Sequence, residues 1–201
     1  MSMTSFGPPR QSYRWMMFID GENLAIRAKN IARAECRLLE PSLFYVPDVF
    51  LWFPKQSATL RTKLVGTRLQ LDPNSIRSFY YTAVQGDDPK KADVEQALWG
   101  LGFTPVVFKK PANQKAKGVD IQLTIDLLTN AFNDNYDVCI LFAGDRDYVP
   151  LVKEVQRRGK VVCLSFFGHA EGGLRPELKI AADQFGDITS MFLEECAPLS
   201  T

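Results

Sequence analysis

Histidine occurs only once in the 201-residue chain, at His169, and the four cysteines show none of the spacings of metal-binding motifs. A single histidine without paired cysteines cannot build a zinc site, so zinc-dependent chemistry is not expected. Cys139 and Cys163 lie inside apolar runs, which is typical of buried, unreactive thiols. Nothing suggests a disulfide framework, and the chain is therefore expected in a reducing compartment, the cytoplasm.

The sequence also has no long apolar run and no strong charge bias. No segment approaches the roughly 20 apolar residues of a membrane-spanning helix, so no contact with a membrane is expected. The glycine-rich loop 168–173 lacks the Lys-Ser/Thr pair of a nucleotide-binding P-loop. With 24 basic and 23 acidic residues the formal net charge is only +1. Any contact with nucleic acid must then come from a local basic patch.

The residues that are present fit one globular domain. Hydrophobic residues make up 46% and charged residues 23% of the chain, within the range of folded proteins. No internal repeat or linker divides the sequence, and its length suits one domain with a large core. We expect a single domain over residues 15–195, a flexible lead-in over 1–14 and a short C-terminal tail over 196–201.

Short apolar runs alternate with longer segments of helical period. The runs expected to be strands are 15–19, 76–84, 104–108, 137–143 and 160–167. The segments expected to be helices are 23–34 with Asn23 as N-cap, 89–101, 120–132, 148–158 and 174–182. Strands that are apolar on both faces and alternate with helices indicate a parallel sheet covered on both sides. The sequence therefore predicts an α/β fold, a three-layer α/β/α sandwich with a mostly parallel central sheet.

The stretch between residues 38 and 72 follows this pattern less well. Residues 43–53 are rich in aromatic residues and proline, and residues 56–71 have a helical period. For 43–53 we favour ordinary core packing over the alternative, which is contact with another protein or with a second copy of the chain.

Acidic residues stand where the expected strands end. Asp20 comes directly after the first apolar run, and Asp145 and Asp147 follow the fourth. Asp120 opens the helix expected over 120–132. In parallel α/β sheets ligands bind beyond the carboxyl ends of the strands, so these four residues can share one edge. Each alone is also typical of a turn or of a helix cap, but four together at one edge favour a site.

Clustered carboxylates repel one another unless a cation neutralises them. Hard divalent cations such as Mg²⁺ or Mn²⁺ prefer carboxylate and water oxygens as ligands. A site that also retains water can clamp a phosphate for in-line displacement. The pattern by itself thus indicates a metal or phosphate site.

Three motifs in this order resemble the NYN domain, the LabA-like branch of the PIN-like nuclease superfamily. They are FIDGEN at 18–23, KGVD at 117–120 and AGDRDYVPL at 143–151, and the resemblance extends over about residues 15–190. It implies a PIN-like, Rossmannoid fold and a ribonuclease whose metal-binding and catalytic residues are Asp20, Asp120, Asp145 and Asp147, with Mg²⁺ or Mn²⁺ as cofactor. It also implies that Asn23 lies beside the metal, where it orients a carboxylate or touches phosphate.

A basic stretch follows the strand expected over 104–108. It leads into Asp120 and contains four lysines, Lys109, Lys110, Lys115 and Lys117. A lysine-rich loop at that edge would hold the phosphate backbone of RNA, single-stranded or structured, without reading its sequence. A solvated surface loop is the alternative. Arg146, between two of the aspartates, is also placed to meet a phosphate.

The chain departs from the family pattern at Ala143, where the family often has Ser or Thr. The missing hydroxyl keeps open a second hypothesis, a non-catalytic RNA-binding or regulatory module that retains the fold and the acids without turnover. Asp126 and His169 are expected to be structural or incidental, and Arg27 to be ordinary surface. Thr124, one helical turn after Asp120, is expected on the same face as the site.

Overall fold

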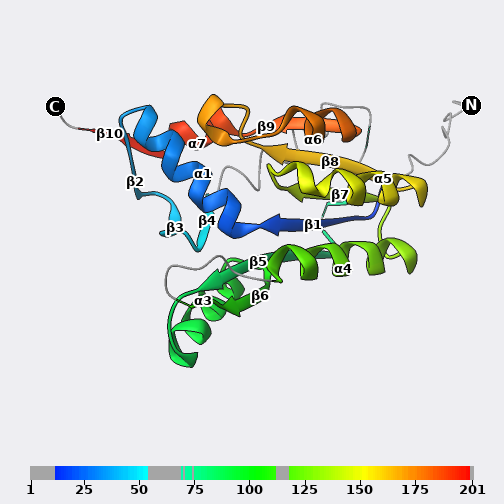
Figure 1. Cartoon of the computed structure of the whole chain (residues 1–201), viewed down its shortest axis with the longest axis horizontal. Helices are drawn as coiled ribbons and strands as arrows, with labels where there is room; N and C mark the ends of the chain where they lie inside the picture. Colours follow the sequence, from blue (N-terminus) through cyan, green and yellow to red (C-terminus); the bar gives the residue numbers. More distant parts are fainter. Residues whose placement is uncertain (1–11, 54–68, 70, 74, 112–117, 200–201) are drawn as a thin grey trace, which may run out of the picture.

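Six parallel strands form the central sheet of the chain (Figure 1). The computed structural model describes residues 12–53, 69, 71–73, 75–111 and 118–199. In spatial order the strands are β6 (Thr104–Lys109), β5 (Arg77–Val84), β1 (Trp15–Asp20), β7 (Val138–Phe142), β8 (Val161–Phe166) and β9 (Gln184–Asp187). Every neighbouring pair in this sheet is parallel. The predicted α/β fold with a parallel central sheet is confirmed.

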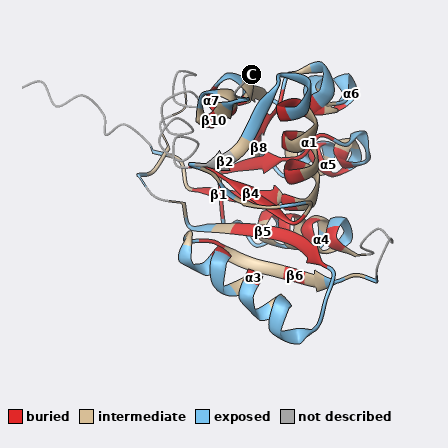
Figure 2. Cartoon of the chain, turned by 90° about the vertical axis from the view of Figure 1, so that its left-hand side faces the viewer, coloured by how far each residue is buried: buried red, intermediate tan, exposed pale blue. Residues whose placement is uncertain are grey.

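Helices cover both faces of the sheet, which makes three layers. One face packs against α1 (Gly21–Ala34), α3 (Asp88–Gly100) and α7 (Thr189–Glu195). The other packs against α4 (Val119–Phe132), α5 (Val149–Arg157) and α6 (Pro176–Ala181). Along β1, Met17 and Ile19 join the first core while Met16 and Phe18 join the second. The inner strands β1, β7 and β8 therefore read as continuous apolar runs because both of their faces are buried, whereas the edge strands β6 and β9 are only partly buried (Figure 2).

Short elements pack around these layers. β2 (Arg37–Pro41) pairs antiparallel with β10 (Cys196–Pro198), and β3 (Phe44–Val46) pairs antiparallel with β4 (Phe50–Trp52). β4 is buried, and Leu51 exchanges two hydrogen bonds with the Tyr80 hydroxyl, at 2.9 and 3.0 Å. The aromatic end of residues 43–53 thus belongs to the core, as the packing interpretation predicted. Contact of this stretch with another protein stays a prediction.

Several helix bounds differ from the sequence expectation by one or two residues, and the starts of α1 and α5 bear on the site. α1 begins at Gly21 because Asp20, and not Asn23, is its N-cap. A 3₁₀ turn, η1 (Arg146–Tyr148), precedes α5, which starts at Val149. The helix expected over 56–71 falls almost wholly outside the described residues. No helix in the described ranges has both the length and the apolar character needed to cross a lipid bilayer.

The order of the strands reverses direction beside β1. From β1 the chain moves outward to β5 and β6, then returns to the other side of β1 and continues through β7, β8 and β9. In open parallel sheets a crevice forms beyond the carboxyl ends of the strands at such a reversal. Here the reversal lies between β1, which ends at Asp20, and β7, which Asp145 closely follows.

Candidate metal centre

A cavity of about 550 Å³ opens beyond the carboxyl ends of β1 and β7, and we call it the acidic cavity. Its lining includes all four aspartates predicted from the sequence, Asp20, Asp120, Asp145 and Asp147. They come from the end of β1, from the first turn of α4 and from the turn η1 after β7. The remaining lining residues are Glu22, Asn23, Ile26, Arg27, Val119, Ile121, Thr124, Ile125 and Tyr148. The fold thus brings together the four carboxylates that the motifs singled out.

Asp20 is the least exposed of the four aspartates. Its Oδ1 accepts a hydrogen bond from the backbone N–H of Asn23 at 3.2 Å, and its Oδ2 accepts one from the Tyr148 hydroxyl at 3.0 Å. Loss of solvation outweighs both bonds and, with the nearby charges of Glu22 and Asp120, raises the pKa of Asp20 to about 6. A carboxylate in this position gains stability from a cation placed beside it.

Two glycines allow the backbone to approach the core closely beside Asp20 and Asp145. A β-carbon on Gly21 would lie 1.9 Å from Tyr80 Cε1, and one on Gly144 would lie 2.4 Å from Phe166 Cε1. Any larger residue at either position must displace an aromatic ring or the backbone that carries the adjacent aspartate.

Turn geometry presents the other three carboxylates to the cavity. Gly118 is the N-cap of α4 with a φ of 97°, in the left-handed region that favours glycine, and Asp120 follows in the first turn. Thr124 lines the cavity as expected, although its hydroxyl donates to the backbone carbonyl of Asp120 at 2.8 Å. After β7, Asp145 Oδ1 accepts a hydrogen bond from the Asp147 N–H at 3.2 Å, which ties the two residues into one turn.

Three polar residues of the acidic cavity, besides its apolar lining, were not assigned to the site from the sequence. Tyr148 is buried, and burial followed by the charge of Asp20 raises the pKa of its hydroxyl, which therefore stays a hydrogen-bond donor. Glu22 is a fifth carboxylate of the lining. Arg27, expected to be ordinary surface, also lines the cavity, so that expectation is wrong. The signal for Tyr148 and Glu22 was their place inside the AGDRDYVPL and FIDGEN motifs.

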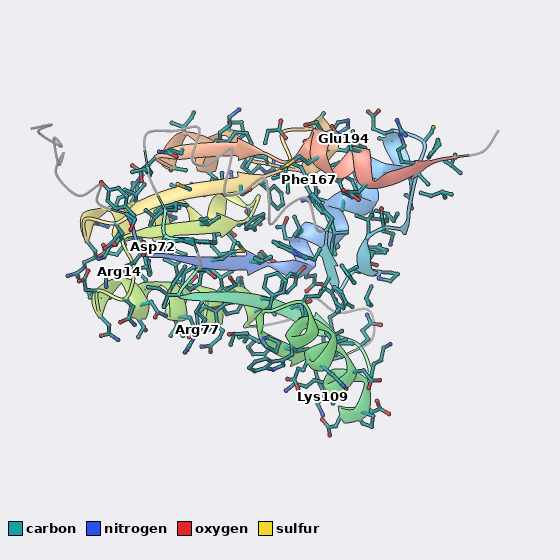
Figure 3. The ribbon with its side chains drawn as sticks, turned by 180° about the vertical axis from the view of Figure 1, so that it is seen from behind. Arg14, Asp72, Arg77, Lys109, Phe167 and Glu194 are labelled. Atoms are coloured by element: carbon teal, nitrogen blue, oxygen red, sulfur yellow. The ribbon has the colours of Figure 1, made fainter. Side chains whose placement is uncertain are left out.

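Among the predicted phosphate-binding lysines, the two that the structure describes each pair with a carboxylate of the chain. Lys110 has only 8% of its side chain exposed, and its Nζ lies 2.6 Å from Glu22 Oε1. Lys109 pairs with the exposed Asp88 at 2.7 Å, beside α3 at the lower margin of Figure 3. Neither of these two lysines is part of the cavity lining. The remaining two, Lys115 and Lys117, lie outside the described residues.

Asn23 and Arg146, the other predicted substrate-binding residues, have different surroundings. Asn23 lines the acidic cavity, and its Oδ1 is buried with no hydrogen-bond partner among the described residues. Arg146 is exposed and lines, with Asp147 and Glu177, a separate depression outside the cavity. A buried acceptor without a partner costs free energy, so Asn23 Oδ1 is an atom that a ligand or water in the cavity would satisfy.

The donor atoms of the acidic cavity suit a hard divalent cation. As they are placed, no three Asp, Glu, His or Cys side chains in the described ranges form a group that could hold a metal ion directly. Mg²⁺ does not require such a group, since it keeps several waters and takes only one or two direct carboxylates. The carboxylate lining, the unpartnered Asn23 Oδ1 and the raised pKa of Asp20 fit that mode of binding.

Two polar residues set aside in the sequence have partners elsewhere. Asp126 accepts hydrogen bonds from the Tyr81 hydroxyl at 3.0 Å and from Gln122 Nε2 at 2.9 Å. His169 Nε2 lies 3.0 Å from Glu35 Oε1. Neither Asp126 nor His169 lines the acidic cavity, and these partners account for both.

Comparison with known proteins places the chain in a family and a fold. A family model described as the NYN domain matches residues 14–189. No curated protein matches the chain. Among solved structures, a protein of unknown function from Vibrio parahaemolyticus is similar, with a TM-score of 0.55 and 21% sequence identity. The similarity covers 90% of this chain and 96% of that one, and at this identity it shows a shared fold only. A weaker likeness, with a TM-score of 0.41 at 11% identity, relates 92% of this chain to 42% of a Listeria monocytogenes protein provisionally assigned as a UDP-N-acetylglucosamine 2-epimerase.

Proposed function

The chain belongs to the NYN domain family, and we propose that it is a metal-dependent ribonuclease of the LabA-like branch. The proposed reaction is hydrolysis of RNA phosphodiester bonds with Mg²⁺ or Mn²⁺ held by Asp20, Asp120, Asp145 and Asp147. The observation that carries this proposal is the meeting of these four carboxylates in one cavity, although Asp20 lies at least 100 residues from the other three in the sequence.

The chain's own groups have distinct parts in this proposal. Asp20 has a fixed orientation, because the Asn23 N–H and the Tyr148 hydroxyl each donate to one of its oxygens. A bound Mg²⁺ or Mn²⁺ would neutralise charge on the reacting phosphate and lower the pKa of a water molecule. The Asn23 amide would orient a carboxylate or touch phosphate, and the Arg27 guanidinium in the same cavity would pair with a phosphate oxygen.

The non-catalytic alternative depended on Ala143. Its side chain is fully buried in the core that the sheet shares with α4, α5 and α6, and it is not part of the cavity lining. A hydroxyl at this position would point into apolar surroundings. Its absence therefore removes no ligand from the acidic cavity, and we favour turnover over a binding module.

The test is a cleavage assay with Mn²⁺ or Mg²⁺ on single-stranded RNA, structured RNA and DNA. We expect the wild-type protein to cleave RNA only when a divalent cation is added. Asp145→Asn should lower the rate by about 100-fold or more, because it removes one of the carboxylates proposed to hold the cation.

A matched control is Asp93→Asn, which neutralises an exposed aspartate on α3 away from the cavity. It should leave the rate unchanged. Equal rates for Asp145→Asn and wild type would sink the catalytic assignment. Metal-dependent binding of RNA without cleavage by the wild type would favour the non-catalytic module instead.

A further inference from the structure

One wall of the acidic cavity is apolar and open to solvent. Ile121 and Ile125 lie one turn apart on α4, with exposed fractions of 62% and 50%, and both line the cavity. Ile26 of α1 also lines it. The cavity therefore presents a group of carboxylates and a group of aliphatic side chains to the same ligand.

The exposure of these two isoleucines is not explained by packing within the chain. Ile121 and Ile125 begin an apolar stripe along α4 that continues through Leu128 to Phe132. Leu128 packs against the core, and the guanidinium carbon of Arg158 lies 3.8 Å from the centroid of the Phe132 ring. Ile121 is the most exposed residue of the stripe, and Phe132 at its other end, with Arg158 over its ring, is 53% exposed. Alanine would be a better helix former than isoleucine at such positions, so local helix stability does not account for them.

We propose that Ile121 and Ile125 form a base-binding wall, which receives the nucleobase of a nucleotide whose phosphate lies at the aspartates. This inference rests on the proposed function, since it assumes that a phosphodiester occupies the carboxylate side of the cavity. The two isoleucines are then specificity-determining residues for that reaction, because they distinguish a nucleotide that carries a base from one that does not.

The chemistry of the wall fits a nucleobase. A base has two apolar faces and no net charge, so it can pack on aliphatic side chains and lie near carboxylates that would repel an anion. A cavity of about 550 Å³ is within the usual range for sites that hold a small molecule or a nucleotide. Aliphatic side chains offer no hydrogen bonds to base edges, so the wall tolerates all four bases. A base seated there has left the stack of its own strand, which a regular duplex does not allow.

The test compares a fluorescent RNA decamer with the same decamer carrying abasic nucleotides at its six central positions. KM and kcat for Mn²⁺-dependent cleavage are measured for the wild type and for Ile121→Ala/Ile125→Ala. A matched control is Ile180→Ala on α6, an isoleucine that is 82% exposed and outside the cavity lining. Both substituted sites in the double variant are solvent-exposed helix positions, where alanine preserves folding.

We expect the wild type and Ile180→Ala to favour the base-bearing decamer by about fivefold in KM, which corresponds to the lower end of what a base gains by packing on an aromatic ring. In the double variant this preference should fall to about twofold. An undiminished preference in the double variant would overturn the proposal. So would a wild type that sediments as a dimer while the double variant is a monomer, because the isoleucines would then bind a second copy of the chain.

A second measurement does not depend on turnover. RNA with 4-thiouridine at its central positions is irradiated with the protein in Mn²⁺, and the cross-linked peptide is identified. The proposal expects cross-links within residues 119–128. Cross-links there without cleavage would support the base wall and count against hydrolysis. Cleavage with cross-links only outside this segment would support hydrolysis and refute the wall.

Discussion

At the scale of single residues, the absence of a side chain at Gly21 determines where the preceding residue, Asp20, lies. The hydrogen atom in place of a side chain lets the backbone after Asp20 lie against Tyr80, whose hydroxyl is bonded to Leu51. Tyr80 is fully buried and cannot move outward without breaking these bonds. Asp20 can therefore occupy its position only because the next residue, Gly21, has no β-carbon.

Gly21→Ala should lower the free energy of unfolding by about 3 kcal/mol, since it forces an atom into a closely packed site. The measurement is equilibrium unfolding in urea. Gly100→Ala is the matched control, because a β-carbon at this last residue of α3 would meet no neighbouring atom within 4 Å. That change should stabilise the chain by about 0.5 kcal/mol. Equal effects of the two substitutions would contradict the packing argument.

At the scale of elements, the ion pair between Lys110 and Glu22 joins the end of β6 to the first turn of α1. Their side chains are 8% and 20% exposed, and the Nζ–Oε1 distance is 2.6 Å. Glu22 also lines the acidic cavity, so Lys110 supplies a positive charge close to that group of carboxylates. The sequence suggested a phosphate-binding role for Lys110, and the structure shows this intramolecular partner.

Lys110→Met should lower the free energy of unfolding by about 2 kcal/mol, because it leaves a mostly buried carboxylate without its counter-charge. Lys109→Met is the matched control. Its ion pair joins side chains that are 50% and 82% exposed, and such surface pairs contribute less than about 1 kcal/mol. Thermal unfolding of both variants in metal-free buffer checks the difference. If both lysines prove equally dispensable, the pair with Glu22 has no structural role.

At the scale of the whole molecule, the alternation of apolar runs and helical segments was sufficient to predict the sheet, its parallel strands and its two covering layers. The small elements β2, β3, β4, β9, β10 and α7 escaped prediction, because strands of three to five residues and a helix of seven carry too few positions to show a clear period.

In the candidate site, only the residues that belong to the sequence motifs could be predicted. Strand ends placed Asp20 and Asp145 together, since parallel strands end at one edge. Spacing along α1 could not reveal that Arg27 lines the cavity, because that depends on where α1 lies relative to α4, which covers the opposite face of the sheet. The partner of Lys110 was equally hidden, since Glu22 lies 88 residues away in the sequence.

The opposite end of the sheet carries a pH-dependent contribution to stability. The Arg14 guanidinium and backbone N–H both donate to the Asp137 carboxylate, at distances from 2.8 to 3.2 Å. The Arg14 side chain is the main cause of the lowered pKa of Asp137. A lowered folded-state pKa stabilises the fold above the pKa of the unfolded chain, and this contribution is lost as the pH falls through the folded value.

Asp137→Asn should therefore be less stable than the wild type by about 1 kcal/mol at pH 7, the value of a partly exposed pair. The difference should shrink as the pH falls below about 4, where the wild-type carboxyl becomes protonated as well. Urea unfolding at pH 7 and pH 3 measures both values. A difference that is the same at the two pH values would show that the Arg14 contact does not depend on the charge of Asp137.

The central claim is that the acidic cavity binds a divalent cation, and the most direct test is the melting temperature with and without Mn²⁺ for wild type, Asp20→Asn and Asp93→Asn. Asparagine can still cap α1, so Asp20→Asn should fold. At a Mn²⁺ concentration of about 100 times the dissociation constant, wild type and Asp93→Asn should gain about 5 °C or more. Asp20→Asn should gain almost nothing. An equal gain in Asp20→Asn and wild type would contradict the assignment of the cation to this cavity.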